Sequence, residues 1–157
     1  MDAEWHDHPF VRHLAALGFG LDPYRLTPEG EIVLGLRFLT RDAEIVIKFD
    51  RPDTLRVVQY RRRGRRAGVA SAFRDFVWLI FEAADPRFGI TGVIGVISPA
   101  PALDGDTLPA DRLAAFYSRH LAAGTIGREW GSDIMYGRIA DFLACWKRPR
   151  PPVPRPG

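Results

Sequence analysis

Residues 56–84 read RVVQYRRRGRRAGVASAFRDFVWLIFEAA, and this stretch decides how the rest of the chain is arranged. It begins as an apolar, β-branched segment typical of a strand, passes through five arginines around Gly64, and continues as a long helix. Apolar residues recur on one helical face at Val69, Phe73, Phe76, Val77, Ile80 and Ala84. Trp78, Leu79 and Phe81 make the opposite side apolar too, so we expect the second half of the helix to be buried all round.

The turn between this strand and this helix has the chemistry of an anion site. Free backbone N–H groups and the positive end of the helix dipole point to the same place where a helix begins. The arginines around Gly64 add guanidinium groups, which bind phosphate well. The pattern therefore predicts a phosphate site, and the plainer interpretation is a solvated basic turn.

The composition is that of an ordinary globular domain. The chain has 157 residues, of which 46% are hydrophobic and 26% charged, and a length of this order favours a single domain. The net charge of +3 is unevenly distributed, because five arginines lie in residues 61–66 and four basic residues in the last eleven. There is no signal-peptide pattern and no apolar run of about 18 residues, so we expect a cytoplasmic protein without membrane insertion.

The remaining segments predict one α/β domain with two polar ends. Residues 1–8 are expected to be a flexible N-terminus, residues 9–146 a single domain, and residues 147–157 a proline-rich basic tail that is disordered or polyproline. Asp22-Pro23 is interpreted as a turn. Pro9 can open the first helix, whose buried face would hold Phe10, Leu14 and Leu17.

Alternating and β-branched segments predict the strands. We expect three antiparallel strands within residues 32–38, 45–49 and 55–59, a buried strand at 90–97, a helix after residue 106, and a strand pair at 125–130 and 133–139. Residues 139–146 could equally form a short helix. The order of elements is then α-β-β-β-α-β-α-β-β.

Residues 65–70, Arg-Arg-Ala-Gly-Val-Ala, fit an Arg/Gln-x-x-Gly-x-Gly/Ala signature at its three defined positions. Together with the order of elements, this turn resembles that of the GNAT superfamily of N-acetyltransferases. The resemblance implies a mixed, mainly antiparallel sheet flanked by helices, with the pyrophosphate of acetyl-CoA held at the turn. The cofactor-binding residues that it implies are Arg62, Arg63, Arg65, Arg66, Gly68, Val69 and Ala70.

The same resemblance implies that Tyr117 would protonate the departing thiolate, as a general acid can. The plainer interpretation, which we prefer, is that Tyr117 and Phe116 are adjacent core aromatics. A general base is missing from the strands, because Val57, Val58, Val93 and Ile94 offer none. Glu44 and Asp50 could act only from strand ends.

A second resemblance covers most of the chain. The resembling residues are Arg56-Val-Val-Gln59, the arginine–glycine turn, the helix ending Glu82-Ala83-Ala84, residues 113–119 and the region of Trp130. They resemble the LcrR (low-calcium-response R) family of small cytoplasmic regulators encoded with bacterial type III secretion systems. This resemblance implies protein partners within the secretion system and no established catalysis. A GNAT-like scaffold kept after its chemistry was lost reconciles the two resemblances.

Our leading hypothesis is therefore a cytoplasmic regulator or chaperone-like accessory of type III secretion that acts through protein contacts and requires no cofactor. The alternative is an N-acyltransferase that uses acetyl-CoA or another acyl-CoA. Nucleic-acid binding ranks lower, because no recognition-helix pattern accompanies the arginines. We predict no metal site from His6, His8 and His13, and no disulfide from the lone Cys145. The sequence leaves the partner and the oligomeric state open.

Overall fold

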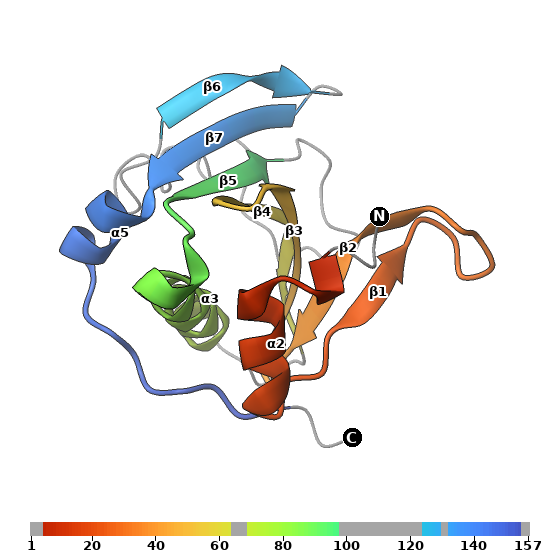
Figure 1. Ribbon diagram of the computed structural model, residues 1–157, viewed down its shortest axis with the longest axis horizontal. Helices are drawn as coiled ribbons and strands as arrows, with labels where there is room; N and C mark the ends of the chain where they lie inside the picture. The colour runs from red at the N-terminus through yellow and green to blue at the C-terminus, as the bar shows by residue number, and fades with distance from the viewer. Residues whose placement is uncertain (1–4, 64–68, 98–123, 130–131, 155–157) are drawn as a thin grey trace.

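The computed structural model describes residues 5–63, 69–97, 124–129 and 132–154. In these parts of the chain the strands form one seven-stranded sheet in the order β1-β2-β3-β4-β5-β7-β6 (Figure 1). The strands are β1 (Asp22–Arg25), β2 (Val33–Leu39), β3 (Ala43–Arg51), β4 (Thr54–Arg62), β5 (Gly92–Ile97), β6 (Gly124–Glu129) and β7 (Ser132–Arg138). Neighbouring strands are antiparallel except β4 and β5, which are parallel. The predicted mixed, mainly antiparallel α/β fold is confirmed.

The described helices are α2 (Pro9–Ala16), α3 (Val69–Ala83), the short 3-10 helix η1 (Pro86–Phe88) and α5 (Ile139–Cys145). Helix α3 is the crossover between the parallel strands β4 and β5, and it packs on β3 and β4. Helix α2 lies beside η1, and α5 follows β7 directly. Residues 139–145 therefore form the short helix that the sequence left as one of two alternatives. The second predicted helix, after residue 106, lies outside the described residues.

The core forms where α3 meets the sheet. Trp78 is 2% exposed and stacks on Phe38, with 6.3 Å between the ring centroids. The ring of Phe19 packs against the same indole, with 5.5 Å between the ring centroids, and so joins the segment after α2 to the core. Residues 75–80 of α3 are all buried, so the prediction of a helix buried all round holds for that segment, while Phe81 is half-buried.

The structure corrects the interpretation of Asp22-Pro23, because these residues are in strand β1 instead of a turn. Asp22 pairs with Arg37 and Pro23 with Leu36 of β2. Strand β1 lies at the edge of the sheet, and a proline without an N–H group is tolerated there. The chain turns within residues 26–32, where Leu26 and Ile32 are 58% and 61% exposed.

Two residues of the N-terminal region, His8 and Leu17, are placed differently from what the sequence predicted. The ring of His8 stacks on Phe49 at 3.8 Å, accepts a hydrogen bond from the N–H of Phe10 and lies 2.9 Å from the carbonyl of Pro52, so this end of residues 1–8 is fixed. Leu17, expected on the buried face of α2, is 46% exposed because the helix ends there. Phe19 fills the core position instead, after the chain turns at Gly18 with φ of 98°.

Candidate functional site

The sheet opens where β4 leaves β5. The two strands pair over Thr54–Val57 and Gly92–Gly95, but β4 continues to Arg62 and β5 to Ile97. Beyond Val57 and Gly95, the facing edges of these two strands do not pair with each other. Strand β4 stays paired with β3 on its other side, and β5 stays paired with β7. The opening therefore lies between two strand edges, directly before the basic turn.

A β-bulge in β4 accounts for the opening. Val46 of β3 pairs with Gln59 and Ile47 pairs with Val57, so Val58 is one residue more than the neighbouring strand can match. A bulge bends its strand and increases the local twist. Val58 directly follows the last residue of β4 that pairs with β5, so the bend turns β4 away at that point.

The arginines at the end of β4 hold the strand to β3 and to the β2–β3 turn. Arg61 contacts Glu44, whose side chain is 5% exposed, through its Nη2 atom at 2.7 Å. Arg63 donates through Nη1 to the carbonyl oxygen of Thr40 at 2.8 Å, and its own N–H donates to the carbonyl of Asp42. These two arginines thus fix the start of the basic turn.

The predicted cofactor-binding residues are only partly described. Arg62 is the last residue of β4, Arg63 follows it, and Val69 and Ala70 begin α3. Arg65, Arg66 and Gly68 lie outside the described residues, as does the predicted acid Tyr117. The described part of the site is therefore the end of β4 and the start of α3.

Both carboxylates considered as strand-end bases are ion-paired. Glu44 binds Arg61, and Asp50 binds Arg56 with 2.8 Å between Oδ2 and Nε. Among the described residues, the second oxygen of Glu44 (Oε1) is buried without a hydrogen-bond partner. The Glu44–Arg61 pair was not predicted, although the two residues lie next to the predicted neighbouring strands at 45–49 and 55–59.

Asp75 is the carboxylate that sequence reasoning missed. It is 3% exposed on α3, and the hydroxyl of Thr40 donates to its Oδ2 at 2.6 Å. The same hydroxyl oxygen accepts from the N–H of Ala43 at 2.9 Å. Burial raises the pKa of Asp75 above its ordinary value, while the Thr40 hydrogen bond acts in the opposite direction. The available signal was an acid placed directly before the continuous apolar run of residues 76–81.

We expect Asp75→Asn to remove a pH dependence of stability. Because the folded state raises the pKa of Asp75 above 3.8, it favours the protonated acid, and that contribution is full below 3.8 and lost as pH rises through the raised pKa. The amide stays neutral, so the variant should not show this loss. Urea unfolding across the acidic range measures the difference, and Asp7→Asn, an exposed site, is the control.

The opposite result would be equally clear. If wild type and Asp75→Asn show parallel stability profiles, Asp75 does not titrate differently in the folded state. Below the raised pKa, Asp75→Ala is expected to cost about 1–3 kcal/mol, because it removes the closer acceptor of the buried Thr40 hydroxyl and leaves it only the carbonyl of Ala43 at 3.4 Å.

The described part of the chain contains neither a metal-binding cluster nor a membrane-spanning helix. No group of three or more His, Cys, Asp and Glu side chains there could hold a metal ion. His13 lies 2.8 Å from Glu82, and Cys145 is an exposed free thiol. None of the helices in the described ranges is long and apolar enough to cross a membrane.

Comparison with known proteins matches this chain to a family and to five chains of solved structures. One of these structures is N-acetylglutamate synthase from Neisseria gonorrhoeae complexed with coenzyme A and N-acetyl-glutamate, at 17% sequence identity and a TM-score of 0.38. The similarity covers 85% of this chain and 32% of that chain, so this chain spans about a third of that protein. No curated protein matches. The model of the LcrR family, described as type III secretion system regulators, matches residues 7–147, and the chain therefore belongs to this family.

Proposed function

We propose that the protein is a cytoplasmic regulator or chaperone-like accessory that acts by contacting another protein of the secretion system. Membership of the LcrR family supports the biological setting. The observation that carries the molecular part is the opening between β4 and β5. Within the described residues, no strand pairs with these two facing edges beyond Val57 and Gly95, and strand edges of this kind bind extended peptide segments through main-chain hydrogen bonds. An extended segment of the partner protein is the ligand that this opening fits.

The basic turn indicates the charge of that segment. Arg61 and Arg63 are engaged in holding the end of β4, as described above. Arg62, Arg65 and Arg66 complete a run of five arginines in residues 61–66, where β4 ends. Complementary charge steers association and selects partners, so the segment that binds here should be acidic.

Charge reversal in the turn tests this proposal. In a strain that lacks its own copy of the gene, Arg65→Glu with Arg66→Glu should impair regulated secretion as strongly as the deletion does. Arg12→Glu is the matched control, because Arg12 is a 70% exposed arginine of α2 and should leave secretion unchanged. Normal secretion in the double variant, with the protein present at its usual level, would refute the turn as the contact.

The second candidate function is the acyl-CoA-dependent N-acyltransferase, and the same opening favours it. The amide-containing arm of an acyl-CoA could lie between the two strand edges, and its pyrophosphate could bind where α3 begins. In that case the binding residues are the seven predicted above, Gly68 lets the backbone approach the phosphates, and Tyr117 is the acid.

Calorimetric titration with acetyl-CoA and CoA separates the two functions. For the non-catalytic regulator we expect no heat and no thermal shift at millimolar ligand. Micromolar binding that is lost in Gly68→Glu would overturn that expectation, because a carboxylate at residue 68 would repel a pyrophosphate group at the turn. The acceptor of the acyl group would then be the next question.

A further inference from the structure

The C-terminal segment, residues 147–154, for which the sequence predicted a disordered or polyproline tail, is held against the domain. It leaves α5, passes the C-terminal end of α3 and reaches the β2–β3 turn (Figure 1). No helix or strand spans it, yet it contacts the domain at both ends. We refer to residues 148–154 as the tail segment.

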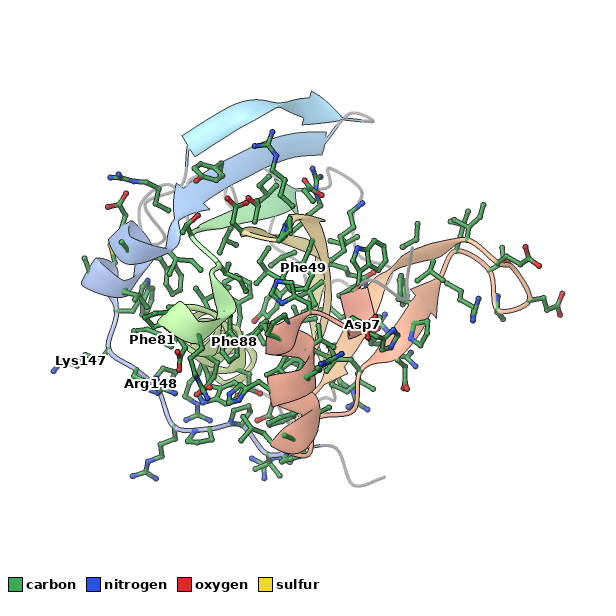
Figure 2. All side chains as sticks on the ribbon, viewed as in Figure 1. Asp7, Phe49, Phe81, Phe88, Lys147 and Arg148 are labelled. Atoms are coloured by element: carbon green, nitrogen blue, oxygen red, sulfur yellow. The ribbon has the colours of Figure 1, made fainter. Side chains whose placement is uncertain are left out.

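The first contact is an ion pair at the end of α3. Arg148 donates to Oε1 of Glu82, while the other carboxylate oxygen of Glu82 lies 2.8 Å from Nε2 of His13. The Glu82 side chain is 12% exposed, and that of Arg148 is 57% exposed. Figure 2 shows Arg148 near Phe81, on the side of α3 from which α5 leads into the tail segment. One partly buried carboxylate therefore receives the first arginine of the tail segment.

The second contact is made by the main chain at the β2–β3 turn. The N–H of Arg41 donates to the carbonyl oxygen of Val153 at 2.8 Å, and Thr40 forms a β-bridge with Pro154. The side chain of Pro152 is buried, although Pro151 and Val153 on either side of it are exposed. The chain is thus fixed at Arg148 and again at residues 152–154.

The order of residues between these contacts is that of a polyproline ligand. The tail segment reads Arg-Pro-Arg-Pro-Pro-Val-Pro, which contains the Pro-x-x-Pro pattern at Pro149 and Pro152. A polyproline II helix has three residues per turn, so these two prolines would share one face. Pro149 is half-buried and Pro152 buried, whereas Arg150 and Pro151 are exposed. The burial of the segment follows that three-residue period.

We propose that the tail segment is the protein's own ligand in a peptide-binding site, and that the same site binds an Arg-Pro-x-x-Pro segment of another molecule when the tail segment is released. The site consists of Glu82 for the arginine, the surface under Pro152, and the main chain of Thr40 and Arg41. Recognition of a preformed polyproline chain by an apolar surface with an acidic group is a recurring mode of peptide binding. This inference does not depend on the function proposed above.

The pocket next to Glu82 gives such a ligand additional room. It measures about 340 Å³ and is lined by Phe81, Glu82, Ala84, Asp85, Pro86, Leu143 and Arg148. Its two carboxylates and its apolar side chains suit a second basic residue with a methylene stem. A longer ligand could place the side chain that precedes its arginine here, whereas Lys147 of the tail segment is exposed.

Release of the tail segment requires few bonds to break. Its one described ion pair is more than half exposed on the arginine side, and such pairs hold weakly in water. Val153 is 49% exposed, so its side chain contributes little. The proline residues also reduce the conformational freedom that the released segment regains, which keeps its rebinding favourable.

A labelled peptide with the sequence of residues 147–157 tests the proposal against the full-length protein. Wild type should bind it weakly, because its own tail competes. Full-length protein with Arg148→Ala and Pro152→Ala should bind it at least tenfold more tightly, as measured by fluorescence anisotropy. Adding Glu82→Gln, which keeps the size of the side chain, should abolish the gain. Equal affinity of wild type and the double variant would overturn the proposal and leave the tail segment as packing alone.

Amide hydrogen exchange on wild type provides a second test that needs no variant. If the tail segment is released while the domain stays folded, the Arg41 amide should exchange at least a hundredfold faster than the Ile45 amide in the buried strand β3. Excess unlabelled peptide should slow the Arg41 amide by occupying the same site. Exchange of Arg41 only at the rate of global unfolding would refute release.

Discussion

Replacing Trp78 by alanine is expected to lower the free energy of unfolding by about 3–5 kcal/mol, the range for removal of a large buried aromatic side chain. The indole is 2% exposed and contacts Phe38 and Phe19, so its loss leaves a cavity between α3 and the sheet. Domains of this size are stable by about 5–15 kcal/mol, so about a fifth or more of the total would be lost. Urea unfolding followed by circular dichroism measures it.

The matched control for this substitution is Leu26→Ala. Leu26 is 58% exposed at the end of the β1–β2 hairpin, and surface substitutions of this kind stay within about 0.5 kcal/mol. If Trp78→Ala were as mild as Leu26→Ala, the packing of α3 against the sheet described here would be wrong. A structural disturbance limited to the basic turn would not lower the free energy of unfolding this much. The expected decrease comes from the middle of the core, where Trp78 lies.

Gly35→Ala should destabilise the protein by about 1–3 kcal/mol through crowding within the sheet. A methyl group at this position would lie 2.7 Å from the carbonyl oxygen of Ile47 and 2.8 Å from Cγ1 of Val46. The first of these is backbone of the neighbouring strand β3, so the two strands would have to move apart. The same change would disturb β1, because Gly35 also pairs with Tyr24.

Gly20→Ala provides the control for Gly35→Ala. A methyl group there has nothing within 4 Å, and its backbone conformation is not one that glycine alone favours. We expect this variant to be as stable as wild type or slightly more stable, because alanine restricts the unfolded chain. Thermal unfolding of the two variants side by side gives the comparison, and an equal loss in both would contradict the close approach of β2 and β3.

The sequence predicted the parts of the fold that repeat a pattern. Helical spacing of apolar residues predicted α3, and alternation of apolar residues predicted β2, β3 and β4. Each pattern arises because one face of the element is buried. Strand β1 was missed because Asp22-Pro23 has the chemistry of a turn, and only its position at the edge of the sheet makes the proline acceptable. The sequence pattern of a single segment does not show where its strand lies within the sheet.

The candidate site could be predicted less completely than the fold. The arginine turn is visible in the sequence, but the opening beside it depends on the extra residue Val58, which appears only when β3 and β4 are paired. Asp75 and Thr40 are 35 residues apart, and no local pattern connects them. The contacts of the tail segment with Glu82 and Arg41 are likewise long-range. The identity of a ligand at residues 64–68 stays a prediction.

Thr40 belongs to two sites at once, and this has a thermodynamic consequence. Its main-chain oxygen accepts from Arg63 at the start of the basic turn, while its residue pairs with Pro154 of the tail segment. Binding equilibria that share a group are linked, and linkage is reciprocal. By whatever factor a ligand of the turn changes the docking of the tail segment, docking changes the affinity of that ligand by the same factor. Ligand binding at the turn can therefore be measured with the tail segment docked and with it released. The ratio of the two affinities gives the coupling free energy between the two sites.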